Sequence, residues 1–132
     1  MLAPLAALFP PPLWLIHAAV ALVWLYEGLW CKLLRGQPHE FEVIGAVPAF
    51  GPRLGARILL FIGVVEVAVA AWTLSGQAAL PCAVFQTGLL IALNSGGLLW
   101  SRHIIHDPAG MVVKNFAFLV LAWVGAGVVQ TP

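Results

Sequence analysis

Four long apolar runs constrain this chain more than any other feature of its sequence. They cover residues 13–31, 54–74, 78–100 and 111–129. Each run approaches the ~20 residues that an α-helix needs to cross a bilayer at about 1.5 Å per residue. The pattern therefore predicts four membrane-spanning helices.

The composition agrees with a membrane protein. Of the 132 residues, 62% are hydrophobic and only 8% are charged, and a soluble domain of this size cannot hide so much apolar surface. We predict an all-α, polytopic integral membrane protein in which residues 1–132 form one transmembrane domain. The net charge of +1 provides no basic surface, so nucleic acid is not expected as a partner.

The first loop contains a further helical signal. Pro38 suits the first position of a helix, and Phe41 and Ile44 follow with a spacing that places both on one face. The Gly51-Pro52 pair then marks a turn. We predict a short interfacial helix in this loop.

The basic residues predict the orientation in the membrane. The loop between the second and third runs contains no Lys or Arg, whereas the other two loops and their flanks contain all six. By the positive-inside rule, loops one and three are cytoplasmic and both termini lie outside. We expect the bacterial inner membrane. The six residues are Lys32, Arg35, Arg53, Arg57, Arg102 and Lys114.

Cysteine and histidine spacing does not favour a disulfide or a metal site. Cys31 and Cys82 fall at opposite faces of a bilayer whose core is about 30 Å thick, too far apart for a disulfide. His103 and His106, together with His39, could ligate a metal, because histidines three residues apart do so on some helices, but Asp107-Pro108 interrupts the helix. No nucleophile–base signature, phosphate loop or dinucleotide fingerprint is present. We expect no catalytic residues and favour a protein that is not an enzyme.

Glu27 and Glu66 lie inside apolar runs. A carboxylate in hydrocarbon costs at least a few kcal/mol and needs a partner, a proton or a function. We expect Glu66 to lie near the middle of the membrane, to face the bundle interior and to be largely protonated at neutral pH. Two interpretations remain open: a polar cavity that binds a ligand, or polar contacts that only hold helices together.

Other polar residues cluster in the same half of the membrane. Because Glu27 and Lys32 are five residues apart, they do not share a face of an α-helix, and Glu27 is expected to find its partner on another helix. Lys114 lies at the mouth of a helix, where exposed N–H groups favour anions. The candidate intramembrane or ligand-lining residues are Glu66, Glu27, Asn94, Lys32, Lys114 and Asn115.

Three stretches of the chain resemble the DoxX-like family of small four-helix membrane proteins. The first is WLYEGLWCKLL at residues 24–34, which ends the first apolar run. The second is GVVE at residues 63–66, and the third is Asp107-Pro108 followed by Lys114-Asn115. The resemblance implies four helices and an association with redox membrane biology, including quinol-linked oxidation and complexes of redox partners.

The leading interpretation is an accessory or ligand-binding subunit of a membrane redox or electron-transfer complex. It would have no cofactor of its own, contact membrane lipid or a quinone, and associate with other membrane subunits. One alternative is a small proton-coupled transporter, in dimer form, that uses Glu27 or Glu66. Another is a quinone-linked membrane oxidoreductase. The sequence leaves homodimer formation open.

Overall fold

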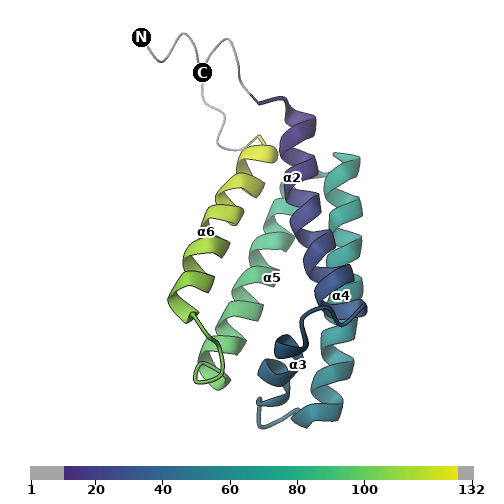
Figure 1. Cartoon of the computed structure of the whole chain (residues 1–132). Helices are drawn as coiled ribbons and strands as arrows, with labels where there is room; N and C mark the ends of the chain where they lie inside the picture. Colours follow the sequence, from purple (N-terminus) through teal and green to yellow (C-terminus); the bar gives the residue numbers. More distant parts are fainter. Residues whose placement is uncertain (1–10, 128–132) are drawn as a thin grey trace.

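The computed structural model describes residues 11–127. Most of this part of the chain is helical, with no strand among the described residues (Figure 1). The elements are α2 (Leu13–Leu25), the π-helix η1 (Tyr26–Leu33), α3 (Pro38–Gly45), α4 (Gly51–Ser75), α5 (Ala79–Trp100) and α6 (Pro108–Gly125).

Four of these helical stretches are long and apolar enough to cross a membrane. They are α4, α5, α6 and the continuous stretch Leu13–Leu33 formed by α2 and η1. The short α3 occupies the first loop between the first two spans. The predicted fold class, a four-helix membrane protein with a short helix in its first loop, is confirmed.

Proline and glycine set most of the helix ends. Pro38 and Pro108 open α3 and α6, and Pro52 lies in the first turn of α4, where the missing N–H has no intrahelical partner to lose. Gly76 ends α4 with a φ of +69°, a left-handed conformation that glycine adopts without steric cost.

Two spans begin earlier than the apolar runs indicate. α4 begins at Gly51 and not at 54, and α6 begins at Pro108 and not at 111. Asp107 caps α6 by accepting a hydrogen bond from Gly110 N at 3.0 Å, so the Asp107-Pro108 pair starts a helix. α6 ends at Gly125, whereas the run was predicted to reach 129, and residues 128 and 129 lie outside the described part.

The first span lies between α4 and α6, and α5 packs against α6 (Figure 1). The core is centred on Trp24, which packs edge-on against Phe118 with ring centroids 5.4 Å apart. The α3 helix packs on α4 at the end of the bundle where α5 turns into α6. Ser101, in that turn, donates a hydrogen bond to Val43 O and so joins α3 to the third loop.

Candidate functional site

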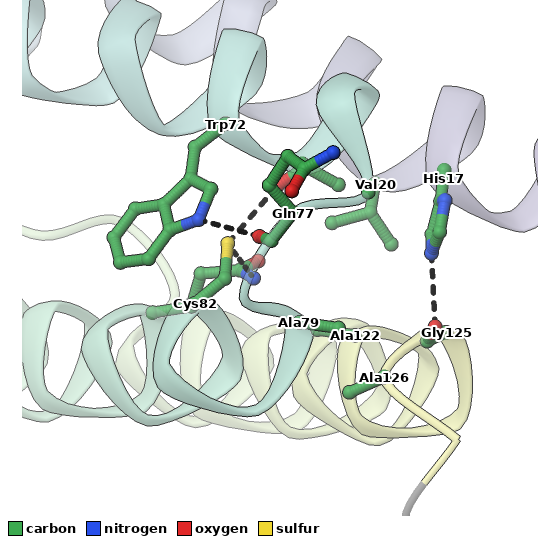
Figure 2. A pocket seen from close by; sticks show the side chains of 12 residues that line it. His17, Val20, Trp72, Gln77, Ala79, Cys82, Ala122, Gly125 and Ala126 are labelled. Carbon is green, nitrogen blue, oxygen red and sulfur yellow. Dashed lines mark hydrogen bonds between the residues drawn. The ribbon is translucent and has the colours of Figure 1, made fainter.

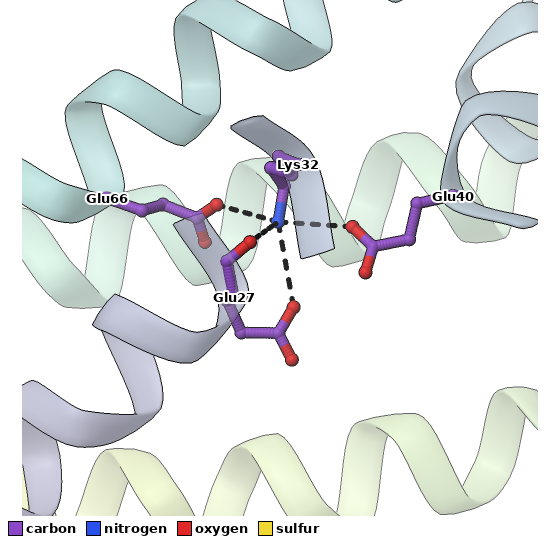
Figure 3. Close-up of polar contacts among 4 residues, drawn as sticks. All are labelled: Glu27, Lys32, Glu40 and Glu66. Carbon is purple, nitrogen blue, oxygen red and sulfur yellow. Dashed lines mark hydrogen bonds and ion pairs between the residues drawn. The ribbon is translucent and has the colours of Figure 1, made fainter. Parts of the chain in front are cut away.

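A buried lysine holds three carboxylates together at one end of the bundle. Lys32 Nζ lies 2.6 Å from Glu66 Oε1, 3.1 Å from Glu40 Oε1 and 3.6 Å from Glu27 Oε2 (Figure 3). The side chains of Lys32 and Glu66 are 5% and 3% exposed, whereas those of Glu27 and Glu40 are 40% and 30% exposed. We call these four residues the carboxylate–lysine cluster. Its buried half is an ion pair, and its outer half is two accessible carboxylates.

The π-helix explains why Glu27 and Lys32 meet, and it corrects the expectation that they would not. In η1 the hydrogen bonds link residues five apart; just past its end, Leu34 N donates to Leu29 O at 2.8 Å. The backbone hydrogen bonds of a π-helix join residues five apart, so residues 27 and 32 lie on the same side of the helix. Lys32 Nζ also donates to Glu27 O at 3.4 Å. Glu27 therefore finds its partner on its own helix.

Two glycines bring Glu66 to the cluster. A Cβ atom on Gly28 would lie 2.6 Å from Gly63 O, and one on Gly63 would lie 3.0 Å from both Gly28 O and Lys32 Cβ. Only residues without side chains allow η1 and α4 to approach this closely, as in small-residue contacts between membrane helices. Glu66 lies about one turn after Gly63 and thus faces Lys32.

The cluster forms part of the wall of a cavity of about 650 Å³. The first span, α3, α4, α5 and α6 all contribute to the lining, which is mostly apolar. All six candidate residues from the sequence line this cavity, and Trp24, His39 and Glu40 join them. The apolar lining includes Leu59, Ile62, Leu93, Trp100, Ile105, Met111 and Phe118.

A second polar region lies on α5 and α6. Asn115 Nδ2 donates to Asn94 Oδ1 at 2.9 Å, and Asn94 Nδ2 donates to Leu90 O at 2.7 Å. Lys114 borders the same cavity and is exposed. The carboxylates and the amides therefore belong to different elements around one cavity.

His39 on α3 also lines the cavity. Its Nδ1 lies 3.2 Å from Glu42 Oε2, and its ring stacks on His106 with centroids 4.4 Å apart. Its Nε2 is buried and has no hydrogen-bond partner among the described residues. His17 lies at the opposite end of the bundle, where Nε2 is 2.9 Å from Gly125 O.

Metal-ligand atoms also come together near the cluster. One ligand atom each from Glu27, Cys31 and Glu40 lies within 4.8 Å of the others. The ammonium of Lys32 already sits beside both carboxylates and supplies a positive charge there. A metal held by all three residues would compete with this lysine. Cys31 and Cys82 are both buried and free.

A much smaller cavity, of about 20 Å³, lies at the other end of the bundle (Figure 2). Its lining includes His17, Thr73, Gln77, Cys82 and Gln86. A volume of about 15 Å³ is enough to hold one water molecule. This cavity is therefore the size of a single water site.

A buried series of polar contacts leads from the small cavity toward the large one. Thr73 Oγ1 lies 3.6 Å from Cys82 Sγ, and Gln86 Nε2 donates to Cys82 Sγ at 3.3 Å. Gln86 Oε1 in turn accepts from Trp24 Nε1 at 2.7 Å. Gln86 borders the small cavity and Trp24 borders the large one, so this hydrogen bond joins the linings of the two cavities.

Sequence reasoning did not identify Glu40, His39, Trp24 or Gln86 as members of these sites. Glu40 and His39 lie in a loop helix whose position depends on how the chain folds back. A buried lysine does require neutralisation, and that requirement is the one sequence signal for additional carboxylates.

The comparisons with known proteins support one assignment. The family model described as the DoxX-like family matches residues 21–123, which is more than three quarters of the chain. This range contains the whole carboxylate–lysine cluster and both asparagines. Neither the search of curated proteins nor that of solved structures finds a match. On its family match and its four membrane helices, this chain belongs to the DoxX-like family of membrane proteins.

Proposed function

We propose that this protein binds a small amphipathic molecule inside the membrane, as an accessory subunit of a membrane redox assembly. The cavity of about 650 Å³ beside the carboxylate–lysine cluster is the observation that supports binding. Sites for small molecules are typically about 300–1,000 Å³, mostly apolar, with a few converging polar groups. This cavity has that size and that lining.

The proposed role in a redox assembly rests on the family resemblance and on the outer surface of the bundle. Large apolar side chains project from α5 and α6, including Leu99, Val113 and Phe116. Such faces suit membrane lipid and equally suit a neighbouring membrane subunit. We therefore assign no cofactor to this chain and place electron-transfer chemistry in the partner subunits.

Cavity filling tests the binding proposal directly. Leu93 lines the cavity, whereas Ile91 on the same helix is exposed. The wild type, Leu93→Trp and Ile91→Trp would each be isolated from native membranes in mild detergent, and bound small molecules and co-isolated proteins identified by mass spectrometry. We expect a small molecule to accompany the wild type and Ile91→Trp but not Leu93→Trp. Equal recovery from all three variants would contradict binding in the cavity.

The same isolation tests the proposed partners. We expect subunits that carry redox cofactors to accompany the protein. Repeated recovery of this chain alone in gentle detergent would contradict the accessory-subunit role, while leaving ligand binding to be judged by the cavity variants.

One observation favours a second function, that of a small proton-coupled transporter. The Trp24–Gln86 hydrogen bond joins the lining of a water-sized cavity to that of the large cavity, which Glu66 also lines. In this proposal the pair is a closed barrier between the two sides. Purified protein in liposomes would be tested for proton uptake driven by a pH gradient. Flux that is changed by Gln86→Leu and lost in Glu66→Gln would support transport, and flux equal to that of protein-free liposomes would exclude it.

A further inference from the structure

We propose that the ligand of the large cavity is a protonated amine attached to an apolar body, with its ammonium group against the carboxylates of Glu27 and Glu40. This inference rests on the proposed binding function and specifies the chemical class of the ligand. Three features of the cavity wall support it: its charge, the pairing of its lysine and its remaining acceptors.

The first feature is the charge of the wall. Three carboxylates, Glu27, Glu40 and Glu66, surround the single ammonium of Lys32. Glu66 is fully enclosed with Lys32 and forms the closest pair, at 2.6 Å. Glu27 and Glu40 lie farther from the same ammonium, which cannot neutralise all three carboxylates. The accessible face of the cluster is therefore an acidic one, in a region where unbalanced charge is costly.

The second feature is that Lys32 is already surrounded by oxygen atoms of the protein. The neighbours of Nζ are oxygens of Glu66, Glu40 and Glu27, the last through both its carboxylate and its backbone carbonyl. A ligand that offers only acceptors, such as a quinone carbonyl, would have to compete with these oxygens for the lysine.

The third feature is a set of acceptors that face the cavity. Each carboxylate has lone pairs beyond the contact it makes with Lys32, and Glu27 and Glu40 are partly exposed. The carboxylates of Glu27 and Glu40 can therefore accept hydrogen bonds from an ammonium group in the cavity.

The rest of the cavity suits an apolar body. Leu59, Ile62, Leu93 and Phe118 line it beyond the acidic wall. Charge-assisted hydrogen bonds are about twice as strong as neutral ones and would offset the cost of taking the ammonium out of water. Lys114 lines the cavity from α6, and among the described residues it forms no ion pair with Glu27 or Glu40.

Two matched probes test this assignment. Dodecylamine, which is protonated at neutral pH, and dodecanol share one hydrocarbon chain. Their binding would be measured with protein in lipid nanodiscs and corrected for uptake by protein-free nanodiscs. We expect dodecylamine to bind at least about tenfold more tightly, which corresponds to 1.4 kcal/mol. The Glu27→Gln/Glu40→Gln double variant should lose this preference and keep its affinity for dodecanol.

Glu42→Gln is the matched control. Glu42 does not line the cavity, and glutamine still offers an oxygen to His39 Nδ1, so this variant should bind both probes like the wild type. If the double variant loses dodecanol as well, Glu40→Gln alone decides by the same criterion, because it leaves the contacts of Lys32 with Glu66 and Glu27 in place.

The outcomes separate the two proposals. Equal affinities for amine and alcohol in the wild type, or a preference for the amine that survives removal of both carboxylates, would overturn the amine assignment while leaving the cavity as a binding site. Binding of neither probe above the level seen with Leu93→Trp would overturn the binding function itself.

Discussion

Lys32 is the residue on which the polar end of the bundle depends. Burying an ammonium costs several kcal/mol unless it is paired and fully hydrogen-bonded, and here the carboxylates of Glu27, Glu40 and Glu66 provide the pairing. The reverse also holds, because these carboxylates have no other cation among the described residues within ion-pair distance. Removal of the lysine would leave three acidic groups facing one another.

We therefore expect Lys32→Met to destabilise the protein by about 3–5 kcal/mol, the loss typical of breaking a buried ion pair. Thermal unfolding in detergent would measure it, with Lys114→Met, an exposed lysine, as the control expected to be near neutral. Adding Glu66→Gln to Lys32→Met should restore part of the stability, because one unpaired carboxylate is removed. Equal stability of Lys32→Met and the wild type would contradict this account of the cluster.

Substitutions of Glu66 can show whether this residue exchanges a proton or only holds the helices together. Glutamine keeps the size and an oxygen for Lys32, so Glu66→Gln should accumulate and assemble normally. Leucine removes the acceptor, and Glu66→Leu should lower stability by about 1–3 kcal/mol, the cost of an unsatisfied buried partner. If proton exchange at Glu66 matters, Glu66→Gln loses function at normal abundance. Abundance in membranes and ligand binding, measured together, separate these cases.

At the scale of elements, the contact of η1 with α4 depends on Gly28 and Gly63. A methyl group on Gly28 would lie within van der Waals overlap of Gly63 O, and overpacking of this kind typically costs about 1–3 kcal/mol. Gly28→Ala should therefore lower the unfolding temperature and weaken ligand binding, because Glu66 is displaced from Lys32. Gly88→Ala is the control, since nothing lies within 4 Å of its added Cβ. Equal effects of the two substitutions would show that the close approach is not required.

The helices were predictable from sequence and the cluster was not, for physical reasons that differ between elements. The four membrane spans can be predicted from the length of the apolar runs alone. The α3 helix can be predicted from Pro38 and from the spacing of the apolar residues that follow it. The π-helix is not visible in an apolar pattern, because nearly every residue of the first run is hydrophobic and the period of its hydrogen bonds leaves no trace. Glu40 could not be predicted as a member of the cluster, because its carboxylate meets Lys32 only after α3 folds back onto α4.

At the scale of the whole molecule, the orientation in the membrane remains a prediction. All six Lys and Arg residues flank loops one and three, so these loops should be cytoplasmic. In intact cells, a membrane-impermeant thiol reagent should label Gln77→Cys, in the second loop, and not Gln37→Cys, in the first. Both positions are exposed, and both native cysteines are buried. Labelling of Gln37→Cys alone would invert the topology and place the large cavity on the outer side.

The π-helix also determines which changes in chain length the protein can tolerate. A spacing of five residues in a π-helix and a spacing of four in an α-helix both return to the same face. Loss of one exposed residue between Glu27 and Lys32, such as Leu29, would therefore let η1 become ordinary α-helix and still leave the two charges together. The α4 helix contains no π-helical turn among its described residues and so cannot absorb the loss of a residue in this way. Loss of one residue between Gly63 and Glu66 would rotate the carboxylate by about 100° and turn it away from the lysine.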